Sequence, residues 1–232
     1  MTDRRRSFHS HLDDMVDEVV SMGIYARDMV RRAGAALVSR DAVAAEQVIR
    51  DDDPLDVRYL QLEETWLQTM ALQTPVATDL RVMSVVLHSG HSVERIGDQA
   101  VSTAGTVRAT IGLPSHPQVL ATVAEIVDLV CPMVDTALDS LERRDLDLAM
   151  SVPTMGRPVE RLERSMYAMV AKCREDEEQL EWAVRMTVVA RNLGRVGARA
   201  VDIAEQVAFL LSGVFHEFTS EDWGPGPADR DE

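Results

Sequence analysis

Two carboxylates four residues apart, Glu94 and Asp98, mark the part of this sequence best suited to chemistry. Residues at this spacing lie on one face of a helix, where like charges oppose helix formation by roughly 0.2–0.5 kcal/mol unless something compensates them. Asp52, Asp56 and Glu63 share a face of an earlier segment, and neighbouring helices of a bundle can bring such faces together. Carboxylate oxygens are the ligands that Mg²⁺ and Mn²⁺ prefer. The pattern predicts either a divalent metal site or a set of solvated acids on an acidic surface.

His91 falls in the same helical arc as Glu94 and Asp98. As a ligand it would shift the preference of the site toward iron, zinc or manganese, and otherwise it is a partly exposed polar residue. A ferritin-like oxidase needs Glu-x-x-His pairs, and no histidine here has a glutamate three residues before it. A nucleophile elbow and a phosphate-binding glycine-rich loop are also absent from the sequence. We therefore expect a protein that is not an enzyme.

The charge balance limits the classes of partner. The 232 residues contain 39 Asp and Glu against 24 Lys and Arg, a formal net charge of -15. Such a surface repels nucleic acid and anionic lipid, so we expect no nucleic acid partner and membrane contact only through other proteins. The two cysteines are far apart and cannot form a disulfide framework, and the first residues lack the apolar core of a signal peptide. These features favour the reducing cytoplasm.

The elements that must position these acids are helices. Aromatic residues make up only 4% of the chain, and apolar residues recur at steps of three and four along every long segment, which predicts an all-α protein. Asp53 and Pro54 predict a helix start in the first half, and Ser151–Pro158 predicts an interruption in the second. Val93–Ala100 is matched by Leu193–Ala200, which indicates a duplication. We expect a tandem pair of three-helix bundles with internal pseudo-symmetry.

The composition also predicts where these bundles begin and end. We expect a flexible amino-terminal segment over residues 1–7, a first bundle over 8–111, a linker rich in Gly and Pro over 112–117 and a second bundle over 118–213. The acidic tail over 219–232 carries too few apolar residues to form a core, so we expect it to be disordered.

Two segments of the first half resemble the signature of the PhoU family, the phosphate-specific transport system accessory proteins. They are Gln73–Arg81 (Gln-Thr-Pro-Val-Ala-Thr-Asp-Leu-Arg) and Val93–Asp98 (Val-Glu-Arg-Ile-Gly-Asp), and the resemblance extends from about Phe8 to Leu211. It implies a cytoplasmic regulator that restrains phosphate uptake and the phosphate-starvation response when phosphate is plentiful. The implied partners are the ATPase subunit of the phosphate ABC transporter and a sensor histidine kinase. We also expect a homodimer.

The resemblance further implies a metal site, because the family binds divalent metal through a Glu/Asp-x-x-x-Asp motif on the bundle surface. The metal would be Mg, Mn, Fe or Zn. The ligands that the resemblance assigns in this chain are Asp52, Asp56, Glu94 and Asp98.

The second half departs from this pattern. Gly156, Gly194 and Ala198 occupy the positions of three of the acids, and Glu160 alone remains. Losing three carboxylates removes most of the charge that would hold a divalent ion, so we expect metal in the first repeat only. The same loss leaves a second hypothesis open, a diverged helical scaffold that binds partners without metal. A helical metalloenzyme is the third.

Overall fold

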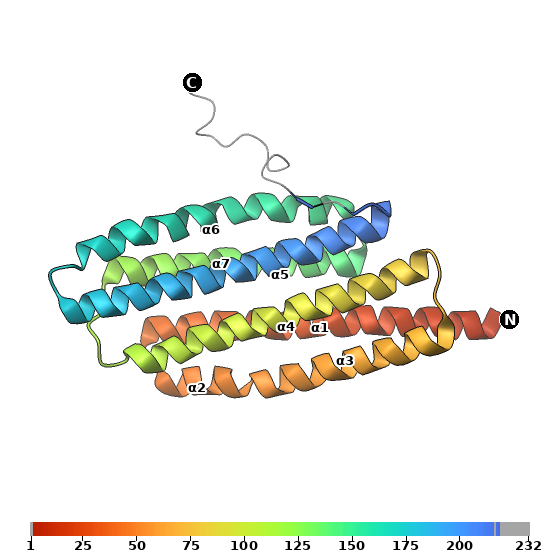
Figure 1. The fold of residues 1–232 in the computed structure, drawn as a ribbon, viewed down its shortest axis with the longest axis horizontal. Helices are drawn as coiled ribbons and strands as arrows, with labels where there is room; N and C mark the ends of the chain where they lie inside the picture. Colours follow the sequence, from red (N-terminus) through yellow and green to blue (C-terminus); the bar gives the residue numbers. More distant parts are fainter. Residues whose placement is uncertain (1, 216, 219–232) are drawn as a thin grey trace, which may run out of the picture.

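The protein is described by a computed structural model that covers residues 2–215 and 217–218, with the backbone alone for residues 2–7. These residues form helices and no strand, so the predicted all-α fold is confirmed (Figure 1). The helices are α1 (Thr2–Ser39), α2 (Ala42–Arg50), α3 (Asp52–Gln73), α4 (Thr78–Thr110), α5 (Pro117–Arg143), α6 (Leu146–Lys172) and α7 (Glu177–Ser212). Within this range, no helix combines the length and the apolar character needed to cross a lipid bilayer.

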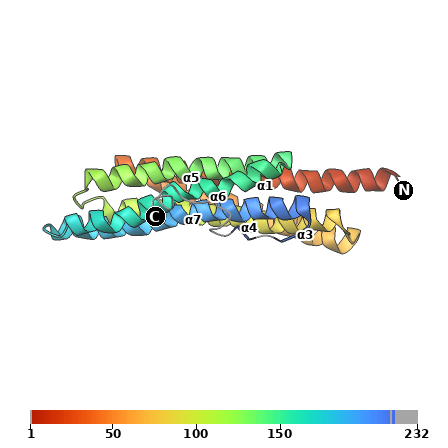
Figure 2. The same ribbon diagram turned by 90° about the horizontal axis from the view of Figure 1, so that it is seen from above.

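The helices form two bundles that lie side by side along one long axis (Figures 1 and 2). The first bundle contains α1 to α4, with α2 and α3 together making one arm, and the second contains α5, α6 and α7. Helix α4 packs against both α1 and α7, and α5 packs against α1, α6 and α7. The two bundles are therefore joined along their length and not only through the connecting segment.

The ends of the helices differ in places from the predicted boundaries. Helix α1 begins at Thr2, so residues 2–7 are helical, and the flexibility of this segment stays a prediction. The physical reason for the early helix start is that no Gly or Pro interrupts the arginine-rich start, and arginine favours helix. Figure 2 shows these first turns of α1 projecting beyond the other helices. Helix α5 begins at Pro117, the last residue of the predicted linker, and the predicted disordered tail over 219–232 lies outside the described residues.

The break in the arm of the first bundle lies at Asp51 and not at Asp53. Asp51 is the single residue between α2 and α3, and its carboxylate is held by the guanidinium of Arg32 on α1. The corresponding arm of the second bundle is unbroken, because α6 runs through both Pro153 and Pro158. The predicted interruption over residues 151–158 is therefore absent. Val152, Pro153 and Val159 are buried there, which indicates that packing keeps the helix continuous despite the missing amide donors.

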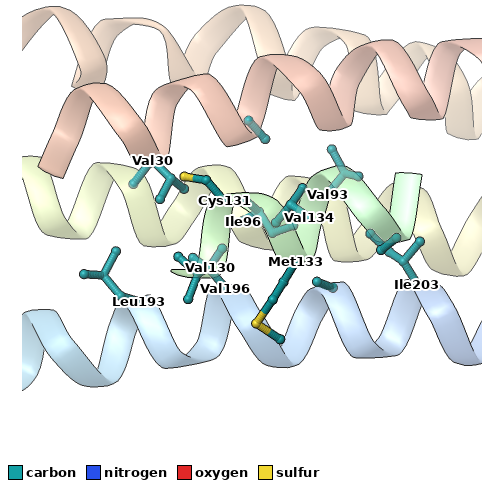
Figure 3. Packing of buried hydrophobic residues seen from close by; sticks show 14 of the residues in the cluster. Val30, Val93, Ile96, Val130, Cys131, Met133, Val134, Leu193, Val196 and Ile203 are labelled. Atoms are coloured by element: carbon teal, nitrogen blue, oxygen red, sulfur yellow. The ribbon is translucent and has the colours of Figure 1, made fainter. Parts of the chain in front are cut away.

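One hydrophobic core runs through both bundles (Figure 3). All seven helices contribute to it, and the residues at its centre include Val30 (α1), Val93 and Ile96 (α4), Val130 and Val134 (α5), and Leu193 and Val196 (α7). Apolar side chains at helical spacing thus bury themselves between repeats as well as within each repeat. The shared core makes the surface of the first bundle part of one packed body.

Gly34 on α1 lies where the two bundles meet. A Cβ atom at this position would stand 2.6 Å from Cγ2 of Val127 on α5 and 3.4 Å from its Cβ. Valine relieves such a clash poorly because its χ1 rotation is restricted. We expect Gly34→Ala to lower the free energy of unfolding by about 1–3 kcal/mol, measured by urea denaturation.

The control for this substitution is Gly105→Ala on α4. Nothing lies within 4 Å of a Cβ added at Gly105. Alanine there should raise the stability by about 0.5–1 kcal/mol through its better helix propensity. Equal effects of the two substitutions would contradict the close contact between α1 and α5.

Candidate metal site

The start of α3 lies against the middle of α4, which places the two predicted acid pairs on facing helices. Gly97 on α4 permits this approach, because a Cβ atom there would lie 2.4 Å from Cδ2 of the buried Leu55. The same Cβ would lie 3.5 Å from Oδ1 of Asp52. The carboxylate of Asp52 therefore sits beside the helical turn that carries Glu94 and Asp98.

The junction between α2 and α3 fixes where this first turn of α3 begins. The hydroxyl of Tyr25 on α1 donates to the backbone carbonyl of Asp51 at 3.2 Å, and the amide of Gln47 donates to its carboxylate at 2.8 Å. Together with the Arg32 ion pair, these contacts tie the junction to α1. Asp52 is the next residue, so its position follows from contacts that α1 and α2 make.

The electrostatics show that the four predicted ligands are neighbours. The pKa of Asp52 is raised to about 6, first by burial and then by the charges of Asp56, Asp98 and Glu94. The pKa of Glu94 is also raised, mainly by burial and by Asp98. Carboxylates that raise each other's pKa in this way form a site that favours a cation.

Arg95 supplies one such positive charge from within the chain. Its Nη1 lies 2.8 Å from Oδ2 of Asp98 and its Nε lies 3.4 Å from Oε2 of Glu94. Among the described residues, no donor hydrogen-bonds to that buried Oε2 atom. The side chain of Arg95 is 47% exposed, so solvent reaches it. The guanidinium thus partly neutralises the acids but leaves a buried carboxylate oxygen without a hydrogen-bond donor.

The donor chemistry of this cluster fits a hard divalent cation, because all four predicted ligands offer carboxylate oxygens. Over the part of the chain that the structure describes, however, no three Asp, Glu, His or Cys side chains surround one point closely enough to hold a metal ion. A metal would therefore have to displace Arg95 and draw the carboxylates together. The assignment of Asp52, Asp56, Glu94 and Asp98 as metal ligands stays a prediction.

The sequence did not reveal the role of Arg95. It predicted that Glu63 shares a face with Asp52 and Asp56, but in the structure Glu63 binds a tyrosine. Arg95 lies three residues before Asp98 on α4, a spacing that allows an ion pair and could have been noticed. Glu63 accepts a hydrogen bond from the hydroxyl of Tyr59 at 2.9 Å, and burial together with this bond raises the pKa of Tyr59 to about 12. His91 lies beside the Tyr59 ring, with 6.3 Å between the ring centroids.

The corresponding place in the second bundle is built differently. A Cβ atom at Gly194 would lie 1.6 Å from Oε1 of Glu163, so a carboxylate from α6 covers the α7 backbone where the first bundle has Glu94. Beside it is a cavity of about 190 Å³, lined by apolar residues such as Met133 and by Glu160 and Glu163. The sequence analysis did not single out Glu163. The expectation that the second repeat holds no metal stays a prediction.

A pH dependence of stability follows from the raised pKa of Asp52. The ordinary pKa of an aspartate is 3.8 and the pKa of Asp52 in the fold is about 6, so between these pH values the native state binds more protons than the unfolded chain. This carboxylate therefore costs stability as the pH rises. We expect Asp52→Asn to gain stability relative to wild type from about pH 4 to about pH 7. The gain should be on the order of 1 kcal/mol, because solvent screens the half-exposed group.

Thermal or urea unfolding in metal-free buffer at the two pH values measures this difference. Asp53→Asn is the control, because Asp53 is an exposed acid in the same first turn of α3. It reports the loss of a charge that favours a helix amino terminus. If both variants showed the same pH dependence, the acidic neighbours would not raise the pKa of Asp52.

Comparisons with known proteins agree with this architecture. A family model described as the PhoU domain matches residues 19–107 and 123–207. The phosphate-specific transport system accessory protein PhoU homolog of Pseudomonas aeruginosa is 30% identical over 209 residues, covering 90% of this chain and 86% of the relative. PhoU homolog 1 of Mycobacterium leprae is 28% identical over 228 residues, covering 96% and 99%.

Solved structures show the same fold. The crystal structure of PhoU from Pseudomonas aeruginosa superposes with a TM-score of 0.84 at 30% identity, covering 89% of this chain and 100% of that one. The phosphate transport system regulatory protein PhoU from Streptococcus pneumoniae gives a TM-score of 0.83 at 19% identity, covering 91% and 100%, and so shows the fold alone. The two matched segments fall one in each bundle and together span most of the helical residues. The chain therefore belongs to the PhoU family.

Proposed function

We propose that this protein is a cytoplasmic, non-enzymatic accessory protein of phosphate transport that restrains phosphate uptake and phosphate-starvation signalling. The match of both bundles to the PhoU domain supports this proposal most directly. Relatives that align with about nine-tenths of the chain are named phosphate-specific transport system accessory proteins. In the proposal, the protein acts as an adaptor between the ATPase subunit of the phosphate ABC transporter and a sensor histidine kinase.

The acidic cluster of the first bundle is the surface that we propose for regulation. Asp52 and Asp56 come from α3 and Glu94 and Asp98 from α4, and the packing of these helices holds them as one face. A divalent cation, Mg, Mn, Fe or Zn, would supply a positive charge that attracts a carboxylate or phosphate of a partner. The acids hold and orient that charge, and Arg95 competes with it because it already contacts two of them.

A second candidate, an adaptor that works without metal, is favoured by the same arginine. Arg95 contacts Glu94 and Asp98, so the acidic face is partly neutralised by the chain itself. The homodimer expected from sequence is part of either proposal. The outer face of α3, with exposed Val57, Leu60 and Leu67, is an apolar surface suited to a second copy, and sedimentation velocity would detect the dimer.

Metal titration separates the two candidates. We expect Mn²⁺ to bind the wild type and to bind a Glu94→Gln, Asp98→Asn double variant at least about tenfold more weakly, because two carboxylate ligands are lost. Isothermal titration calorimetry on protein freed of metal by chelator gives both affinities. Unfolding in urea checks that the variant is folded.

Two further variants sharpen the result. Glu160→Gln in the second bundle should leave the affinity for Mn²⁺ unchanged, since the counterparts of Asp52, Glu94 and Asp98 in that bundle are not acids. Arg95→Gln should tighten binding, because it removes the competing guanidinium. If no variant differs from wild type, the metal site is absent and the metal-free adaptor is the better description.

The adaptor role is tested in cells. From phosphate-replete cells, we expect the tagged protein to co-purify with the phosphate transporter ATPase and with a sensor histidine kinase, detected by mass spectrometry. Deleting the gene should increase the uptake of radiolabelled phosphate in rich medium. Normal uptake in the deletion strain, with neither partner enriched, would contradict the proposed function.

A further inference from the structure

A cavity of about 370 Å³ lies between the end of α3, the first turns of α4 and the last turns of α7. α4 begins and α7 ends at the same end of the molecule (Figure 1), and the acidic cluster lies further along α4, beside the start of α3. The side chains that characterise it are Trp66, Arg81, Ser84, His88, Phe209 and Phe215. Its volume is in the range of natural sites for small organic molecules.

One side of the cavity is aromatic and held in place. The rings of Phe209 and Phe215 are stacked, with 3.8 Å between their centroids and 9° between their planes. Trp66 donates its Nε1 hydrogen to the backbone carbonyl of Met83 at 2.7 Å, so the indole is oriented and its polar atom is satisfied. Because aromatic residues are only 4% of the sequence, three in one cavity are a strong local concentration. Such a wall suits a flat ring.

The other side of the cavity is polar and carries the positive charge of Arg81. Arg81, Ser84 and His88 recur at steps of three and four on one face of α4. Arg81 donates to the hydroxyl of Thr78 at 3.2 Å, and among the side chains that the structure describes it forms no ion pair with a carboxylate. The nearby Asp79 instead lies 3.4 Å from His9 of α1. Of the described residues that line this cavity none is an acid, although the chain as a whole carries a net charge of -15.

The second repeat carries different side chains at the positions that correspond to Arg81, Ser84 and His88. The positions one hundred residues later, in the register that aligns Val93–Ala100 with Leu193–Ala200, are Glu181, Val184 and Val188. α7 packs in its bundle as α4 does, yet it carries an acid and two valines there. The first repeat therefore places Arg81, Ser84 and His88 where the second has Glu181, Val184 and Val188, and the Arg81 guanidinium also lies against Gly213 at the end of α7.

We propose that this cavity binds a nucleoside monophosphate. The base lies against Trp66 and the stacked Phe209 and Phe215 rings, and the phosphate accepts hydrogen bonds from Arg81, Ser84 and His88. Aromatic faces recognise the base by stacking. Arg81, which forms no ion pair with a carboxylate among the described residues, recognises the phosphate. The site is separate from the acidic cluster, so it stands independently of the proposed function.

Calorimetric titration of the full chain with AMP tests this inference. We expect saturable binding of AMP. Adenosine, which lacks the phosphate, and ribose 5-phosphate, which lacks the base, should each bind at least about tenfold more weakly. Arg81→Gln should weaken AMP binding about tenfold, and Phe215→Ala should weaken it as well. Phe215 is exposed and follows the end of α7, so its loss should cost only its stacking on Phe209, about 0.5–1.5 kcal/mol, and urea unfolding checks that the variant is folded.

The matched control is Arg185→Gln on α7, which removes an exposed arginine that pairs with Glu181 toward the other end of that helix. It should bind AMP as the wild type does. No AMP binding up to about 1 mM, or equal losses in the Arg81 and Arg185 variants, would overturn the proposal. Adenosine or ribose 5-phosphate binding as tightly as AMP would overturn it too. Each of these outcomes leaves the phosphate-transport proposal untouched.

Discussion

The close approach of α3 to α4 is the constraint on which the acidic cluster depends. Gly97 presents no side chain, and this lets Leu55 and Asp52 lie directly on the α4 backbone. Burial of Leu55 stabilises the contact, while the same contact forces Asp52 close to Glu94 and Asp98. Apolar packing thus holds together charges that would otherwise separate. Burial and the repulsion between these acids raise the pKa values of Asp52 and Glu94.

The two repeats resolve this electrostatic conflict in different ways. In the first bundle, Arg95 contacts two of the acids, and the cluster keeps its negative character. In the second, Gly194 and Ala198 remove the acids from α7, and Glu163 of α6 covers the position left open. Burial and the neighbouring Glu160 raise the pKa of Glu163, so two carboxylates also repel each other in the second bundle. A shared fold therefore carries two chemically distinct faces.

The continuous core explains how such faces can be displayed reliably. α4 and α7 contact each other as well as the other helices of their own bundles, so a change in one bundle is felt in the other through packed side chains. Arg32 and Tyr25 of α1 also bind Asp51 at the start of α3, so polar contacts hold α3 against α1. Rigid presentation of surface residues suits an adaptor, whose partners recognise a fixed arrangement of charge and shape.

Local periodicity determined a great deal about this protein from sequence alone. Steps of three and four gave the helices, the matched Val93–Ala100 and Leu193–Ala200 segments gave the duplication, and the spacing of Glu94 and Asp98 gave a shared helical face. Only the tertiary structure decided that Arg95 contacts both acids, that Glu163 covers Gly194 and that a cavity joins α3, α4 and α7. The physical reason is that periodicity fixes which residues share a face. The distance and register between faces, in contrast, depend on how the side chains of separate helices interlock.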